Sequence, residues 1–193
     1  RVYRIYTQLC LNLRIKPKRR LKRDKPEALT VPSAVNQVWS MDFMHASVCK
    51  GKAVHLLNII DDFNREGLAI DIRHSHPSAS VIRTLENIIE YRGKPSAIRF
   101  DNGPEYISNK LVAWAKDKGI ELLYIQPGKP QQNAYIERYN RTVRYDWLNL
   151  YEFESLSDMQ DFSTQWLWHY NHERPNMALG GFTPIQMKYR SVA

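Results

Sequence analysis

The stretch from Ala97 to Tyr106 reads Ala-Ile-Arg-Phe-Asp-Asn-Gly-Pro-Glu-Tyr. Ile98 and Phe100 alternate with their neighbours, which is the period of a half-buried strand. The residues Asn, Gly and Pro that follow Asp101 favour turns and interrupt strands. We therefore expect the Asp101 carboxylate at the end of a strand, where the sheet fixes it and a ligand can reach it. Asp-Asn-Gly is also common in ordinary turns, so a functional role requires partners elsewhere in the chain.

The segments around this strand predict an α/β fold. Apolar periodicity and turn residues place strands at 38–44, 53–60, 67–72, 97–101 and 120–125, and helices at 81–89, 109–118, 131–150, 158–171 and 184–189. Short connections make the first three strands an antiparallel meander. Strands that alternate with helices after such a meander predict a mixed five-stranded sheet with helices on both faces, two of its strands being parallel.

The net charge of +8 lies at one end of the chain. Residues 1–30 contain ten Lys or Arg and two Asp or Glu, whereas residues 31–193 contain 18 of each sign. Such a block attracts polyanions, nucleic acid first, although a solvated linker extended by self-repulsion is the simpler alternative. We divide the chain into the end of an upstream helical region at 1–13, a basic linker at 14–35, an α/β core at 36–150 and a helical C-terminal extension at 151–193.

The composition argues against several classes of protein. Cys10 and Cys49 form no Cys-x-x-Cys pair, so neither a disulfide framework nor a thiolate zinc site is expected. No apolar run is long enough for a transmembrane helix, and the charged N-terminal residues lack the apolar segment of a signal peptide. A reducing cytosol fits these features. Because the chain begins without Met inside a predicted helix, we expect a piece of a longer protein.

Two further carboxylates need an explanation. Asp42 stands inside a predicted strand, where a carboxylate is costly unless it is paired or bound to a metal. Glu137 lies on the helix predicted at 131–150, whose buried stripe is expected to extend to Leu150. The alternative for Glu137 is a surface ion pair with Arg141, worth about 0.2–0.5 kcal/mol. The polar stripe that contains Glu137 also holds Asn133, Asn140, Arg141 and Arg144.

Four sequence words include these carboxylates and the tail of the chain. They are Trp-Ser-Met-Asp-Phe at 39–43, Phe-Asp-Asn-Gly-Pro-Glu-Tyr at 100–106, Pro-Gly-Lys-Pro-Gln-Gln-Asn-Ala-Tyr-Ile-Glu-Arg at 127–138 and Tyr-Asn-His-Glu-Arg-Pro-Asn-Met-Ala-Leu-Gly-Gly-Phe-Thr-Pro at 170–184. With 35 residues between Asp101 and Glu137, they resemble the Asp-Asp-Glu signature of the transposase and retroviral integrase superfamily. The last word resembles the tail of bacterial insertion-sequence transposases, and the resemblance to their catalytic (integrase core) domain covers about residues 36–187.

The resemblance implies a ribonuclease H-like fold in which the first and fourth strands lie side by side. Asp42 would then lie next to Asp101, and Glu137 would reach in from its helix. It also implies two Mg²⁺ ions, replaceable by Mn²⁺, with Asp42 bridging both, Asp101 holding one and Glu137 the other. Two such ions can activate an attacking oxygen and stabilise the leaving one. Water would release a 3′-OH from a DNA strand, and this 3′-OH would attack a second phosphodiester in strand transfer.

The same resemblance suggests roles for further residues. DNA contacts are expected from Lys129, Arg141 and Arg144, and from Lys18, Arg19 and Arg20 in the basic linker. Asn102, Glu105 and Asn133 are expected to support the carboxylates. Asp61 and Asp62 are better explained by turn chemistry than by metal binding. His74, His76, His169 and His172 are better explained as loop or helix-surface residues than as zinc ligands, because no cysteine pair lies near them.

The expected partners follow from the reaction. They are double-stranded DNA, as element ends and as target, a second copy of the chain when active, and an upstream helix-turn-helix, fused by a frameshift or on a separate protein. Residues 1–13 would be a remnant of that helical DNA-binding region. The expected location is the bacterial cytoplasm, in association with the nucleoid. Two alternatives are a regulator that binds DNA without catalysis, which the intact triad disfavours, and a simple ribonuclease H-type nuclease, which the spacing and the tail disfavour.

Overall fold

The computed structural model describes residues 2–9, 31–101, 108–125 and 133–190. Its centre is a five-stranded sheet with the strand order β3-β2-β1-β4-β5. The strands are β1 (Val38–Ser47), β2 (Ala53–Asp61), β3 (Gly67–Arg73), β4 (Ala97–Phe100) and β5 (Glu121–Tyr124). β1, β2 and β3 pair antiparallel, whereas β4 runs parallel to both β1 and β5. The predicted mixed sheet, with a meander and two parallel strands, is confirmed.

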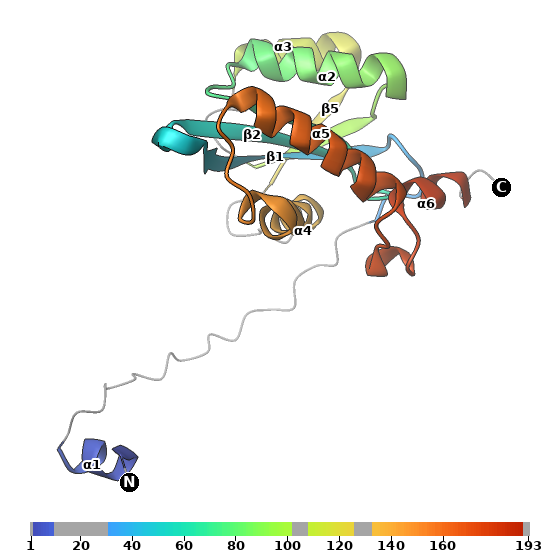
Figure 1. The fold of residues 1–193 in the computed structure, drawn as a ribbon. Helices are drawn as coiled ribbons and strands as arrows, with labels where there is room; N and C mark the ends of the chain where they lie inside the picture. Colours follow the sequence, from blue (N-terminus) through green and yellow to red (C-terminus); the bar gives the residue numbers. More distant parts are fainter. Residues whose placement is uncertain (1, 10–30, 102–107, 126–132, 191–193) are drawn as a thin grey trace.

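Helices cover both faces of this sheet. Figure 1 shows α2 (Ser78–Arg92) and α3 (Asn109–Lys118) together above the strands and α4 (Ala134–Val143) below them. α5 (Leu156–His172) packs on the same side as α4, because its buried Met159 and Trp166 belong to the apolar cluster that contains Ile136. α6 (Pro184–Arg190) follows at the C-terminal end, and α1 (Val2–Gln8) buries none of its residues.

The alternation of β1 assigns each side chain to one face. Trp39 and Met41 are fully buried in the cluster under α2 and α3, whereas Met44 lies in the cluster under α4 and α5. Successive side chains of a strand point to opposite faces. Asp42 therefore shares the α4 face with Met44, although its neighbours in the strand are apolar.

The prediction of one regular α-helix at 131–150 is wrong beyond Val143. α4 ends at Val143 and continues as a π-helical turn, η3 (Arg144–Leu148), in which Asn149 N–H donates to the Arg144 carbonyl five residues earlier. Because each π turn takes in more residues than an α turn, the positions beyond it rotate around the axis. Trp147 is still fully buried, but Leu150, expected in the core, is 66% exposed.

Among the described residues, no helix combines the length and the apolarity that crossing a membrane requires.

Candidate active site

The three predicted carboxylates come from three different elements. Asp42 lies in the middle of β1, Asp101 directly follows β4, and Glu137 is in the first turn of α4. β1 and β4 pair in register up to Ser40 opposite Arg99, and the continuation of this register by two residues brings Asp42 opposite Asp101. Since Asp42 faces the α4 side of the sheet, the tertiary structure directs the three side chains to one region.

The pKa of Asp42 also indicates that the three carboxylates lie near one another. Its pKa is raised from 3.8 to about 6, first by burial and then by the negative charge of Asp101, with a further contribution from Glu137. Hydrogen bonds from the Phe43 backbone and the Asn140 amide oppose this shift only in part. Asp42 is thus a carboxylate whose charged neighbours carry its own sign, and a cation placed among the three groups would relieve their repulsion.

Two asparagines fix the orientation of Asp42. Asn140 Nδ2, on α4, donates to Asp42 Oδ2 at 2.7 Å, and Asn58 Nδ2, on β2, donates to Asn140 Oδ1 at 2.7 Å. The second carboxylate oxygen, Oδ1, accepts from the Phe43 N–H at 2.9 Å. Asn140 was expected on the polar stripe of its helix without an assigned role, and Asn58 was not among the predicted site residues. The available signal was an amide inside the otherwise apolar run at 53–60.

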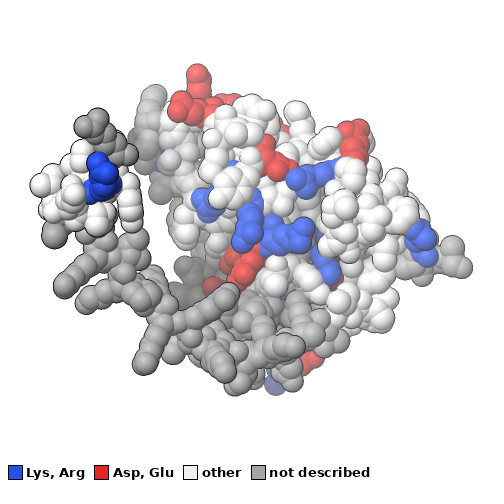
Figure 2. All heavy atoms as spheres, turned by 90° about the horizontal axis from the view of Figure 1, so that it is seen from below, with Lys and Arg blue, Asp and Glu red and all other residues white. Residues whose placement is uncertain are grey.

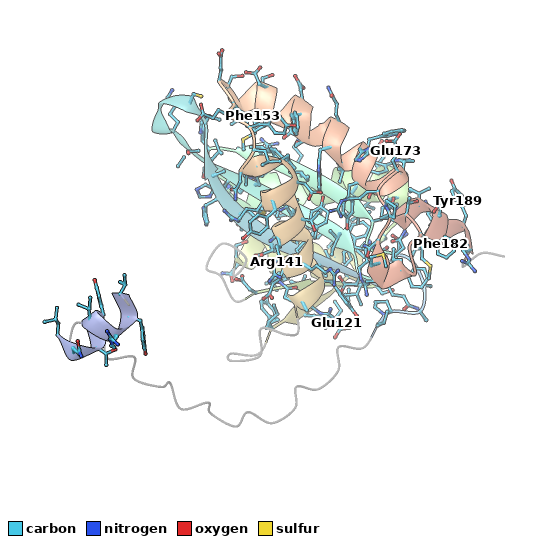
Figure 3. The ribbon with its side chains drawn as sticks, turned by 60° about the horizontal axis from the view of Figure 1, so that its bottom comes forward. Glu121, Arg141, Phe153, Glu173, Phe182 and Tyr189 are labelled. Atoms are coloured by element: carbon cyan, nitrogen blue, oxygen red, sulfur yellow. The ribbon has the colours of Figure 1, made fainter. Side chains whose placement is uncertain are left out.

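Asp101 and Glu137 are exposed, in contrast to Asp42. Glu137 forms no hydrogen bond or ion pair with a described residue, so the surface pair with Arg141 considered above is absent. Arg141 and Arg144 are also exposed on α4, and Figure 3 shows Arg141 on that helix. Figure 2, which views the face that α4 presents, shows Lys and Arg side chains gathered beside a smaller acidic group. This face places basic groups next to carboxylates.

Pairs of these carboxylates suit Mg²⁺ better than a single site formed by all three. No three Asp, Glu, His or Cys side chains within the described ranges are close enough to hold a single metal ion together. Mg²⁺ prefers hard oxygen ligands, keeps several waters, and is commonly held by one or two carboxylates together with substrate phosphates. An Asp42–Asp101 pair and an Asp42–Glu137 pair match that donor set, and the repulsion that raises the Asp42 pKa is what a divalent cation would offset.

The remaining predicted positions divide into described and undescribed residues. Asn133 is buried directly before α4, and its Oδ1 forms no hydrogen bond with any residue that the structure describes. The other predicted positions, Lys129, Asn102, Glu105, Lys18, Arg19 and Arg20, lie outside the described residues.

Asp61 and Asp62 have structural partners. Asp61 accepts from the backbone N–H groups of Asn36 at 2.7 Å and Phe63 at 2.9 Å, which is the turn chemistry expected for it. Asp62 instead forms a buried ion pair with Arg99 at 2.7 Å.

The histidines also have local partners. His74 and His76 bond to the carbonyls of Ala53 and His55. On α5, His169 pairs with Glu173, and His172 bonds to the carbonyl of Trp168. These contacts are structural, although His76 is buried and does not lie on the loop surface expected for it.

Comparison with known proteins identifies the family. The integrase core domain family matches residues 32–130, and a second integrase core domain family matches residues 118–184. The chain belongs to the integrase core domain family. This result confirms the resemblance inferred from the four sequence words.

The similar proteins are products of bacterial insertion elements. The chain is 37% identical to the IS407 uncharacterized 31.7 kDa protein of Burkholderia multivorans over 195 residues, covering 100% of this chain and 70% of that protein. It is also 37% identical over 186 residues to the IS476 uncharacterized 39.2 kDa protein of Xanthomonas euvesicatoria, covering 96% of this chain and 54% of the relative. It is 25% identical to the putative transposase InsK of IS150 of Escherichia coli, covering 97% of this chain and 70% of InsK. The chain therefore spans about half the length of the IS476 relative.

Among solved structures, the HTLV-2 integrase catalytic core domain in complex with magnesium is similar in fold. The TM-score is 0.60 at 21% identity, covering 80% of this chain and 97% of that domain. At this identity the match speaks for the fold alone, and it confirms the ribonuclease H-like architecture expected of an integrase core.

Proposed function

We propose that this integrase core domain is the catalytic domain of a transposase that cuts and joins DNA strands through Asp42, Asp101 and Glu137. The observation that carries the proposal is the state of Asp42. It is a half-buried carboxylate whose hydrogen-bond donors among the described residues are neutral, and whose pKa is raised by burial and by two further carboxylates. A like-charged cluster of this kind is typical of a site for cations and phosphates. Membership of the integrase core domain family and similarity to insertion-element proteins support the assignment.

The cofactor in this proposal is a pair of Mg²⁺ ions, for which Mn²⁺ can substitute. Asp42, together with Asp101 and Glu137, would hold these ions. Bound at these carboxylates, the ions would polarise the attacked phosphodiester and stabilise the charge on the departing oxygen. The magnesium bound by the similar HTLV-2 domain supports this choice of metal.

The residues of the chain itself position the reaction. Asn140 and the Phe43 N–H each occupy one oxygen of Asp42, which fixes the rotation of that carboxylate while each oxygen keeps acceptor capacity. Glu137 projects from a helix whose other side packs into the core through Ile136 and Val143. The site is thus held by rigid elements, as a geometry for in-line phosphoryl transfer requires.

The reaction needs no external energy source in the joining step. In cleavage, a water oxygen forms a bond to phosphorus, the P–O3′ bond breaks, and the strand is released with a 3′-OH. In strand transfer, that 3′-OH forms a new P–O bond in the target as an existing P–O bond breaks, so one phosphodiester replaces another.

The proposed substrate is double-stranded DNA. Arg141 and Arg144 lie on α4 one and two turns beyond Glu137, where they would contact phosphates of an element end. Lys129 and the basic residues Lys18, Arg19 and Arg20 would add contacts, and Asn102, Glu105 and Asn133 would support the carboxylates. Because two element ends must be paired, we propose at least a dimer when active, acting with an upstream helix-turn-helix on the bacterial nucleoid in the cytoplasm.

A labelled-DNA assay tests the proposal. Wild-type protein should convert an end-labelled duplex of its element terminus into cut and joined products with Mg²⁺ or Mn²⁺, and into neither with EDTA. Asp101→Ala and Glu137→Gln should abolish both products while retaining the folded circular-dichroism spectrum. Cut products without joined ones would favour a simple nuclease. Absence of both products from wild type that still binds DNA would favour the non-catalytic regulator, and full activity of Asp101→Ala would refute the triad.

A further inference from the structure

A second basic site lies on the flank of α4 that adjoins the flank with Glu137. A cavity of about 590 Å³ opens there between α4, the end of β2 and the segment that follows α5. Its lining includes three arginines, Arg65, Arg138 and Arg174, and three tyrosines, Tyr135, Tyr139 and Tyr170. The triad and its expected DNA contacts use none of these residues.

The helical geometry places this cavity next to the active site. Successive residues of an α-helix are rotated by roughly 100°, so Tyr135, Arg138 and Thr142 form one flank of α4. Glu137, Arg141 and Arg144 form the adjoining flank, since three positions along the helix rotate Arg138 by roughly 60° from Arg141. A single extended polyanion can therefore contact both sites.

The three arginines make the cavity positive. Arg65 is half-buried, and its guanidinium stacks on the ring of Tyr135 with 3.4 Å between its central carbon and the ring centroid. Burial lowers the pKa of Arg65, which indicates a cation that has lost part of its hydration. Arg138 is exposed and forms no ion pair with a described residue. Arg174 forms an ion pair with Asp146, with 3.0 Å between Arg174 Nε and Asp146 Oδ2.

The guanidinium groups decide which anion the cavity can hold. Tyr139 contributes to the lining, but its Oη is buried, so the arginines are the donors that an anion in the cavity would reach. An anionic oxygen would accept from their planar guanidinium forks, and phosphate is the anion that such forks fit best.

We propose that this cavity binds a backbone phosphate of the DNA substrate, beside the phosphate that reacts. The inference rests on the proposed function, because it takes the substrate to be DNA. The volume is in the range of cavities that hold small organic ligands, so it accommodates a phosphate with its sugar. The cavity belongs to the same helix as Glu137, and that helix presents the face on which basic side chains gather (Figure 2).

Binding of a labelled duplex to the full chain tests this site without any need for cleavage. The probe is a fluorescein-labelled duplex of about 30 base pairs in EDTA, and the affinity is measured by anisotropy between 50 and 200 mM salt. Arg138→Gln should weaken binding about three- to tenfold and reduce the salt slope by about one. Arg83→Gln is the matched control, since Arg83 is equally exposed on α2, on the other face of the sheet. It should keep the wild-type affinity within about twofold.

Arg138→Lys separates a built site from diffuse surface charge. It keeps the charge and removes the planar fork, so it should weaken binding about threefold and leave the salt slope unchanged. Because Arg65 and Arg138 line one cavity, the double variant Arg65→Gln, Arg138→Gln should lose less than the product of the single losses. An Arg138→Gln effect no larger than that of Arg83→Gln would overturn the proposal, as would unaltered binding by Arg138→Lys. A polyglutamate peptide that is bound in an Arg138-dependent way, while DNA is not, would also overturn it.

The outcome is distinguishable from failure of the proposed function. If Asp101→Ala keeps full cleavage, the triad fails while the Arg138 effect on DNA binding stands. If cleavage depends on the triad but Arg138→Gln binds DNA like wild type, the phosphate site alone fails.

Discussion

Asp42 and Asp62 are two carboxylates with similar pKa values and opposite surroundings. Burial is the largest cause for both, and each pKa is raised to about 6. Asp62 is fully buried and faces the guanidinium of Arg99 at 2.7 Å, which opposes the shift. Asp42 is half-buried, its donors within the described ranges are an amide and a backbone N–H, and the charges of Asp101 and Glu137 add to its shift.

The difference shows that two acids whose pKa values are raised to about the same value can have different roles. The Asp62–Arg99 pair is electrically complete, and it ties the turn after β2 to β4. Within the part of the chain that the structure describes, the Asp42 cluster has an excess of negative charge, and no arginine or lysine is hydrogen-bonded to Asp42. A raised pKa alone therefore does not distinguish a candidate metal ligand from a structural ion pair, and the sign of the neighbouring charges is the more informative property.

The largest expected effect is on activity. Asp42→Asn should reduce single-turnover DNA cleavage by at least about 10³-fold, because a neutral amide cannot balance the charge of divalent cations that contribute several kcal/mol to the transition state. Asp62→Asn removes a more deeply buried charge from the completed pair and should keep the rate within about threefold at a temperature where both variants are folded. Equal losses in the two variants would remove the distinction between the acids.

The second effect is on stability. Arg99→Gln leaves Asp62 buried without its cation and should lower the free energy of unfolding at pH 8 by about 2–4 kcal/mol. Without Arg99 the folded pKa of Asp62 moves still further above its unfolded value, so the loss grows as pH rises through that window and shrinks near pH 4. Urea unfolding at the two pH values measures this. The double variant Asp62→Asn, Arg99→Gln should recover most of the loss, and failure to recover would show that the charge of Asp62 is not the cause.

The third effect concerns the amide that fixes Asp42. Asn140→Ala should weaken Mg²⁺ binding about 10–100-fold, as expected when a residue that orients a ligand is lost. The Mg²⁺ dependence of the melting temperature reports the affinity. Asn149→Ala is the control, because Asn149 is exposed beyond η3. An unchanged midpoint in Asn140→Ala would mean that the Asn58–Asn140 relay only packs the helix on the sheet.

The smallest effect is on the pH dependence of stability without metal. The folded pKa of Asp42, about 6, lies above the ordinary value of 3.8, so wild type should lose stability as pH rises from about 4 to 6. Asp42→Asn lacks this titration and should be more stable than wild type at pH 7 in EDTA by on the order of 1 kcal/mol, because partial solvation reduces the full effect. The advantage should disappear below pH 4. An equal advantage at both pH values would assign it to packing, not to charge.

The sequence predicted the sheet because each strand carries its own periodicity. The alternation around Asp42 and Ile98 reproduced β1 and β4, and the turn residues after Asp101 separated that strand from the next helix. The prediction failed at Leu150, where a π turn changes the phase of the helix. Such a turn depends on how Trp147 packs against Phe153 and Phe162 from the following segment, and helical periodicity has no information about that contact.

By itself, the sequence determined which local segments form, which acids were unusual, and how Asp101 and Glu137 are spaced. These are properties of neighbours along the chain, where period and turn chemistry act directly. Only the tertiary structure decided which polar groups meet: Asn140 with Asp42 across 98 positions, Asn58 with Asn140 across 82, and Arg65 with Tyr135 over the second basic site. The reason is that burial and the charges of distant residues set the electrostatics of each group, and both exist only once the sheet and its helices have packed.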